Sequence, residues 1–457
     1  MIIMKKHIDA QKTFFFSQAT KDVSFRINEL NRLAKLLKDN EAALSKGILD
    51  DFKKSAFENY LTELAVVQQD IKEAKRNIHR WSRRQKVSTN IANFPAKSYI
   101  IPEPLGTCLV IGAWNYPYQT SLAPVVAAIA AGNTVILKPS ELPSATSSIM
   151  AKLINEAFDP RIFKVIEGSV DETTALLNQD FDKIFFTGST TVGKIVYKAA
   201  AEKLIPVTLE LGGKSPAIIA EDANLKMTAK RLIWAKFLNS GQTCIAPDYV
   251  LIHKSQEQEF LKHAIAEIEN AAYAFENDNY VQIINERNFD RLTGMLDASK
   301  THIGGDSNKA DRYIAPTMLT NISWDHPSMK EEIFGPILPV LTFSDLDEVI
   351  TNVRKFPKPL SLYIFTSNST TKNRMLKELS FGGGAVNEAV MHISNPHLPF
   401  GGVGASGIGS YHGKSGFDCF THYKSIMDKP TWIELPIKFS PYSKTKLTWL
   451  RRLFKLQ

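Results

Sequence analysis

Cysteine is scarce in this sequence: its 457 residues include only Cys108, Cys244 and Cys419. An odd, widely spaced set of cysteines argues against a disulfide framework and against a zinc site, so no metal is expected. Each thiol is therefore either a small core residue or a reactive group, and the base rate favours the core. Cys108 and Cys419, which lie among apolar neighbours, are predicted to be core residues.

Long apolar runs are also missing, since none reaches the roughly 20 residues that cross a bilayer. The first ten residues are charged and have neither an apolar core nor a cleavage site after them, which predicts a cytoplasmic protein without a signal peptide. The charges nearly balance, with 55 basic and 47 acidic residues and a net charge of +8. In the absence of a DNA- or RNA-binding module, this balance predicts no nucleic-acid partner.

Strand-like and helical patterns alternate from about residue 104 onwards. Apolar runs at 108–111, 134–137, 163–166, 183–187 and 207–209 are separated by helical stretches, and the pattern resumes at 217–220 and 249–253. Such alternation predicts an α/β fold with doubly wound parallel sheets, which bind ligands at the carboxyl ends of their strands.

The C-terminal stretch 438–457 has no acidic residue. Leu447, Leu450 and Phe454 have the spacing of one helix face, and the pattern is typical of a basic amphipathic surface helix. One interpretation is a tail packed on the body or solvated, and the other is peripheral contact with an anionic membrane. The basic residues are Lys438, Lys444, Lys446, Arg451, Arg452 and Lys455.

Four short motifs carry groups that suit catalysis. Cys244 ends the segment NSGQTC, whose small polar residues after a helical stretch indicate a loop. Glu210 ends a predicted strand and is followed by a glycine pair, where functional groups project from a parallel sheet. Asn115 also follows a strand, and its amide can donate a hydrogen bond to a developing oxyanion. Residues 186–193 lie between a strand and a helix, where backbone amides can hold a pyrophosphate.

Together with the segment EEIFGP at 331–336, these motifs resemble the aldehyde dehydrogenase superfamily. The class 3 branch fits best, on the segments WNYP at 114–117, KPSE at 138–141, LPFGGVG at 398–404 and SYHGK at 410–414. The resemblance runs from about residue 20 to about residue 425. It implies a dinucleotide-binding domain (1–84 and 104–209), a catalytic domain (210–404), a small β bridging element (85–103 and 414–430) that makes a homodimer, and a basic tail (431–457).

The resemblance also implies the roles of individual residues. Cys244 is the expected nucleophile, Asn115 and the Cys244 N–H the oxyanion donors, and Glu210 the base that activates water. A thiolate adds to the aldehyde, and a thioester is then hydrolysed. The thiolate requires a lowered pKa, which loop amides or a cationic nicotinamide could supply. NAD is the expected cofactor, with NADP as an alternative, because Glu141 would lie near the ribose hydroxyls. The implied cofactor contacts are Trp114, Lys138, Glu141, Gly188, Ser189, Val192, Glu332 and Phe334.

The expected substrate is an apolar aldehyde, long-chain or aromatic, including carotenoid or lipid-derived ones. One rival is a cofactor-free esterase, which would not need Glu332 or the loop at 188–193. Another is a non-catalytic dinucleotide-binding protein, which predicts the loss of Cys244, Glu210 or Asn115. All of these residues are present, and the presence of Glu210 also argues against a CoA-acylating relative.

Overall fold

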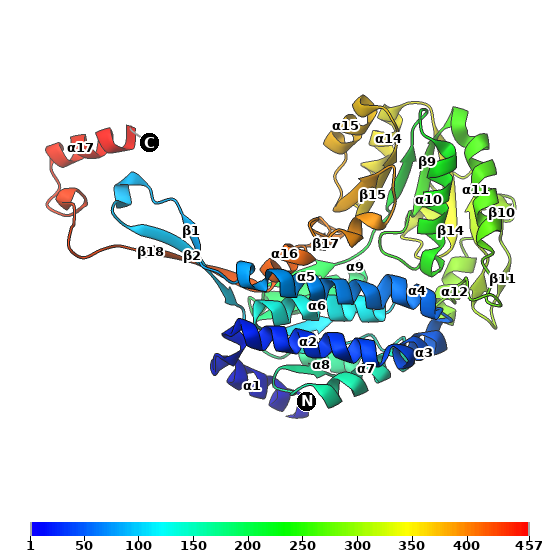
Figure 1. Ribbon diagram of the computed structural model, residues 1–457. Helices are drawn as coiled ribbons and strands as arrows, with labels where there is room; N and C mark the ends of the chain where they lie inside the picture. The colour runs from blue at the N-terminus through cyan, green and yellow to red at the C-terminus, as the bar shows by residue number, and fades with distance from the viewer. Residues whose placement is uncertain (1, 456–457) are drawn as a thin grey trace.

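The structure, a computed structural model, describes residues 2–455. Met1, Leu456 and Gln457, at the ends of the first predicted domain and of the predicted tail, lie outside the described residues. Two large sheets with their helices form the body, and a narrow antiparallel sheet extends away from it as an arm (Figure 1).

The first large sheet has six strands in the order β17-β7-β6-β3-β4-β5. Five strands run parallel, as the sequence predicts, while β17 pairs antiparallel with β7 at the edge. The edge strand was not predicted because its two residues carry no readable pattern. The bounds are β3 (Thr107–Ile111), β4 (Thr134–Lys138), β5 (Phe163–Val165), β6 (Lys183–Thr187), β7 (Val207–Glu210) and β17 (Gly407–Ile408).

Helices cover both faces of this sheet, which confirms the doubly wound arrangement. Alternate residues of a strand point to opposite faces, and in β3 Cys108 and Val110 join one apolar cluster while Leu109 and Ile111 join another. The first cluster includes α2 (Val23–Asp39), α5 (Ala65–Trp81), α6 (Pro117–Ala131) and α7 (Ser144–Ala157). The second includes α1 (Ile2–Phe16), α8 (Val170–Leu177) and α9 (Thr190–Ala201).

The second large sheet has the strand order β10-β13-β14-β9-β8-β15-β16, and all its neighbours are parallel except β10 with β13. Helices α10 (Leu225–Phe237) and α11 (Glu257–Ala271) pack on one face, and α14 (Leu346–Val353) and α15 (Ser369–Glu378) on the other. The bounds are β8 (Pro216–Ile219), β9 (Tyr249–His253), β10 (Thr301–Ile303), β13 (Thr317–Leu319), β14 (Ile337–Phe343), β15 (Ser361–Phe365) and β16 (Gly383–Val386).

The arm is built from strands far apart in the sequence. All eight residues of β18 (Thr421–Asp428) pair antiparallel with β2 (Lys97–Pro104), and β1 (Gln85–Val87) lies on the other side of β2. The strands fall within residues 85–103 and 414–430, which the resemblance assigns to a bridging element, and their role as a bridge stays a prediction. Beyond β18 the chain leads to α17 (Lys444–Lys455) at the far end of the arm (Figure 1). None of the described helices is both long and apolar enough to cross a membrane.

The remaining elements are short or lie at the edges of the body. They are α3 (Glu41–Phe52), α4 (Ala56–Asn59), a π-helix (Tyr60–Leu64), α12 (Glu286–Thr293), α13 (Pro327–Lys330), α16 (Gly413–Cys419), and the hairpin of β11 (Ser307–Asn308) and β12 (Tyr313–Ile314).

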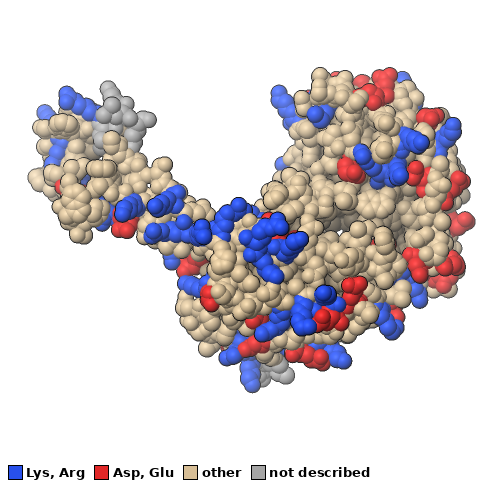
Figure 2. Space-filling view, in the orientation of Figure 1, with Lys and Arg blue, Asp and Glu red and all other residues tan. Residues whose placement is uncertain are grey.

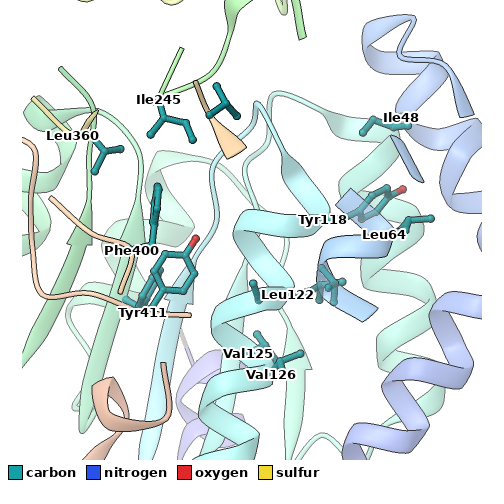
Figure 3. Packing of buried hydrophobic residues seen from close by; sticks show 14 of the residues in the cluster. Ile48, Leu64, Tyr118, Leu122, Val125, Val126, Ile245, Leu360, Phe400 and Tyr411 are labelled. Atoms are coloured by element: carbon teal, nitrogen blue, oxygen red, sulfur yellow. The ribbon is translucent and has the colours of Figure 1, made fainter. Parts of the chain in front are cut away.

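We call each large sheet with its helices a lobe, and one apolar cluster continues from the first lobe into the second. Tyr118 of α6 packs near Ile48 and Leu64, while Phe400 and Tyr411 lie on the side of Ile245 and Leu360 (Figure 3). The two large sheets therefore share a core.

Candidate active site

The loop that carries Cys244 begins where α10 ends. Asn239 and Ser240 adopt the left-handed conformation, with φ of 53° and 52°, which ends the helical path. The amide of Gln242 donates to Asn239 O at 3.2 Å and to Gln282 O at 3.0 Å. The predicted loop is confirmed, but its polar residues are buried, and Cys244 itself is half-buried. The hydrogen bonds make this burial possible, because a buried polar group without a partner is costly.

Asn115 ties the turn after β3 to the cysteine loop. Its Nδ2 donates to Gln242 O at 3.0 Å, and the neighbouring hydroxyls of Tyr116 and Thr243 are 2.6 Å apart. An asparagine amide has two hydrogens, so the second remains available for an oxyanion. The structure thus brings Asn115 to the residues that directly precede Cys244, as an oxyanion site requires.

Glu210 lies at the carboxyl end of β7 with its side chain buried. Neither carboxylate oxygen has a hydrogen-bond partner among the described residues. Burial raises the pKa of Glu210 well above its ordinary value. A buried acid with a raised pKa and unpaired oxygens has the properties of a general acid or base.

Glu332 and Phe334 approach the same region from the second lobe. A Cβ at Gly212 would lie 2.2 Å from a Glu332 carboxylate oxygen, so any side chain there would displace the Glu332 carboxylate. Burial, reinforced by Asp248, raises the pKa of Glu332 to about 8. The Phe334 ring lies edge-on to Trp114, with 5.2 Å between centroids. Trp114, Glu332 and Phe334 therefore converge between the two lobes.

The thiol of Cys244 does not have the lowered pKa that the sequence led us to expect. Burial, and then the carboxylates of Glu332 and Glu210, raise its pKa to about 12. The backbone N–H groups of Cys244 and Ile245 lower it, as expected for loop amides, but burial outweighs them. The correction follows from the depth of the loop, which the sequence does not reveal.

The other predicted cofactor residues lie at one edge of the first sheet, where the parallel strands β4 and β6 end on either side of β3. Gly188 follows β6, and its N–H donates to Glu210 O at 3.0 Å. Ser189 caps α9 by accepting a hydrogen bond from the Val192 N–H at 3.3 Å. Lys138, at the end of β4, is buried and lies 3.4 Å from the carboxylate of the exposed Glu141.

This edge has the features of a dinucleotide site. The first turn of α9 contains no acidic residue, so its N–H groups and helix dipole favour an anion. The buried Thr187 hydroxyl at the end of β6 has no partner among residues 2–455. These observations fit a bound pyrophosphate.

Several residues of the site were missed by sequence reasoning. Gln242 bridges the cysteine loop, and its Oε1 accepts from the Ile284 N–H at 3.0 Å. The buried Lys54 and Glu63 come from the helical N-terminal region and reach the turn at Asn115. Their patterns look like the solvated face of an amphipathic helix, and no local signal in the sequence shows that they are buried.

Two doubly wound lobes that enclose a cysteine, a buried glutamate and an asparagine amide define a class of oxidoreductases. The chain belongs to the aldehyde dehydrogenase family, whose family model matches residues 4–426, and it is an oxidoreductase of that family. It is 46% identical over 459 residues to the 4,4'-diaponeurosporen-aldehyde dehydrogenase of Staphylococcus aureus, with 99% of each chain covered.

Two further comparisons agree. The chain is 41% identical over 453 residues to the aldehyde dehydrogenase family 3 member A2 of Pongo abelii, covering 98% of this chain and 93% of the relative. A solved structure of Staphylococcus aureus AldH in a substrate-bound state superposes with a TM-score of 0.97 at 44% identity, covering 99% of this chain and all of the other. The resemblance to the class 3 branch is confirmed.

Proposed function

We propose that this enzyme oxidises an apolar aldehyde to its carboxylic acid through a covalent adduct on Cys244. The observation that carries the proposal is the convergence of Cys244, the Asn115 amide and the unpaired buried carboxylate of Glu210. These residue types supply a nucleophile, an oxyanion donor and a base.

The chemistry assigns one step to each group. The Cys244 thiol releases its proton to solvent, and the resulting thiolate adds to the carbonyl carbon. The free Asn115 amide hydrogen and the Cys244 N–H stabilise the oxyanion that forms. Oxidation of this adduct leaves a thioester on Cys244. The Glu210 carboxylate then takes a proton from water as the water adds to the thioester, and the acid and the free thiol are released. Because burial raises the pKa of Glu210, its carboxylate is a stronger base toward this water than an exposed carboxylate would be.

A bound nicotinamide dinucleotide would supply the hydride acceptor. In this proposal Lys138 and Glu141 hold the adenosine ribose, and the first turn of α9 holds the pyrophosphate. The exposed Glu141 carboxylate favours NAD over NADP, because it would repel a 2′-phosphate. The remaining contacts proposed are Trp114, Gly188, Ser189, Val192, Glu332 and Phe334.

A cavity of about 440 Å³ supports an apolar substrate. It lies between α10, the end of α11 and residues 388–391. Its lining includes the apolar residues Trp234, Tyr273 and Met391 beside the charged Arg231 and Glu388. Since α10 leads directly into the cysteine loop, we propose that this cavity receives the chain of the aldehyde. The staphylococcal relative is named for a carotenoid aldehyde, and an extended substrate of that kind is proposed here.

We propose that the arm makes a homodimer. Val87, Ile91 and Phe94 on the arm are exposed apolar residues, and burying such side chains is favourable. Light scattering after size-exclusion chromatography tests this assembly. The wild type is expected to have twice the mass of Phe94→Glu, and a monomeric wild type would contradict the proposal.

We also propose peripheral contact between the tail and an anionic membrane on the cytoplasmic side. Leu447, Trp449 and Phe454 of α17 are exposed, and no acidic residue lies in its first turn. Exposed apolar groups among cations fit such a surface. Deleting residues 438–457 should weaken sedimentation with vesicles containing anionic lipid and leave activity on short aldehydes intact. Unchanged sedimentation would refute this contact.

NADH formation with a long-chain aldehyde tests the proposed reaction. Cys244→Ala should abolish it, whereas equal rates for variant and wild type would refute the mechanism. A panel of aldehydes of increasing length, each with NAD and NADP, then identifies the substrate class. Trp234→Ala should alter the KM of long aldehydes more than that of short ones. An esterase without cofactor would hydrolyse esters yet form no NADH.

A further inference from the structure

An ion pair without any solvent exposure lies against Asn115. Lys54 Nζ is 2.9 Å from Glu63 Oε1, and both side chains are 0% exposed. Lys54 follows α3, and Glu63 belongs to the π-helix at Tyr60–Leu64, a rare element that occurs frequently at functional sites. Burying two charges is costly and often no more stabilising than apolar packing. A gain in folding stability therefore does not explain why this ion pair is buried here.

Both members of the pair hold the backbone around Asn115. Lys54 Nζ donates to Asn115 O at 3.3 Å. Glu63 Oε2 accepts from the N–H groups of Tyr118 and Gln119, at 2.7 and 3.2 Å, in the first turn of α6. The ammonium also lies 4.4 Å from the centroid of the Tyr116 ring. The turn that presents the Asn115 amide is thus held on both sides by one buried pair.

The same segment also reaches the cysteine loop. The Asn239 amide donates to Asn115 O at 2.9 Å, so Asn115 O accepts from both Lys54 and Asn239. Glu58 Oε1 accepts from the Asn239 N–H at 2.9 Å. The two proposed oxyanion donors therefore have a common support in residues 54–63.

We propose that Lys54, held by Glu63, is a positioning residue that orients the Asn115 amide toward the oxyanion. This inference rests on the proposed role of Asn115. Lys54 fixes the carbonyl of Asn115, and Glu63 fixes two residues in the first turn of α6, so the Asn115 side chain has little freedom. Because a shift of about 1 Å in a catalytic group can cost about 10²-fold in rate, such support matters for turnover.

The double variant Lys54→Met/Glu63→Gln removes both charges together, so that neither is left buried and unpaired. In Glu63→Gln the amide oxygen still accepts from the Tyr118 and Gln119 N–H groups. We expect kcat/KM for a short aldehyde to fall by about 10- to 100-fold, mostly in kcat. Alkylation of Cys244 by iodoacetamide forms no oxyanion and should change by less than about twofold.

A double-mutant cycle with Asn115→Ala separates positioning from a general structural effect. If Lys54 acts through Asn115, the double variant should lower kcat/KM by less than about threefold in the Asn115→Ala background. An equal loss in both backgrounds, or no loss in the wild-type background, would overturn the proposal. Should the double variant fail to fold, Lys54→Leu/Glu63→Gln, which also removes both charges, takes its place in the same cycle, and the same two outcomes decide.

Arg26→Met is the matched control, because Arg26 is a buried cation at the other end of α6. It donates to Ala130 O at 3.2 Å and to Thr20 O at 2.6 Å. This control should lower the melting temperature and leave kcat/KM within about twofold of wild type. Cys244→Ala tests the proposed function separately. If Cys244→Ala is inactive while the Lys54 variant is unaffected, only the present inference fails.

Discussion

The protonation state of the Cys244 thiol gives a quantitative test of the site. Burial and the carboxylates of Glu332 and Glu210 raise its pKa from 9.0 to about 12. At pH 9 about one thiol in a thousand would then be ionised, compared with about half for an ordinary cysteine. The rate of alkylation by iodoacetamide should consequently rise about tenfold per pH unit below pH 8, and less than tenfold per unit from pH 8 to 10 as the Glu332 carboxylate ionises, without a plateau.

Glu332→Gln is the informative perturbation of that thiol. The pKa of Glu332 is about 8, so its carboxylate is negative only above that pH. Below pH 7 the variant and the wild type should react at equal rates. At pH 10 the variant should react about tenfold faster, which corresponds to about 1.4 kcal/mol.

Intact-mass spectrometry after timed alkylation measures this rate. Peptide mapping separates Cys244 from Cys108, which is buried, and from Cys419, whose sulfur lies 3.1 Å from the Thr208 hydroxyl. Cys244→Ala is the control for background labelling. A plateau of the wild-type rate below pH 9 would refute the raised pKa of Cys244. Equal rates for the two proteins at pH 10 would show that the Glu332 carboxylate does not contribute to it.

Three further predictions concern the other groups of the site. Glu210→Gln should release about one equivalent of NADH and then turn over slowly, because thioester hydrolysis lacks its base; rapid-mixing absorbance would show no burst if Glu210 served another step. Asn115→Ala should lower kcat/KM by about 10²- to 10³-fold, and steady-state kinetics with a melting curve would separate this from unfolding. The raised pKa of Glu332 means that the folded protein holds an extra proton between pH 4.5 and about 8. The contribution of this proton to stability is complete below pH 4.5 and is lost as the pH rises to 8. The melting temperature should therefore fall more between pH 5 and pH 8 for wild type than for Glu332→Gln. An equal fall for the two proteins would contradict this.

The sequence was informative wherever local pattern and chemistry coincide. The strands that end at Ile111, Lys138 and Glu210 follow from apolar runs that stop at small or polar residues. The cysteine loop follows from small polar residues after α10. An edge strand of two residues, β17, has no such pattern, and α1 was not predicted because most of its apolar residues gather at its two ends and do not repeat at helical spacing.

The sequence by itself determined the kind of chemistry: one cysteine in a polar loop, one glutamate at a strand end, and one asparagine after another strand. Only the tertiary structure decided the pKa values of those groups and the contacts that orient them. Burial raises the pKa of Cys244 where loop amides alone would lower it. Lys54 and Glu63 are separated from Asn115 by more than fifty residues in the chain, yet they contact its turn. The physical reason is that desolvation and long-range hydrogen bonds depend on packing, whereas a residue's local pattern describes only its neighbours in the chain.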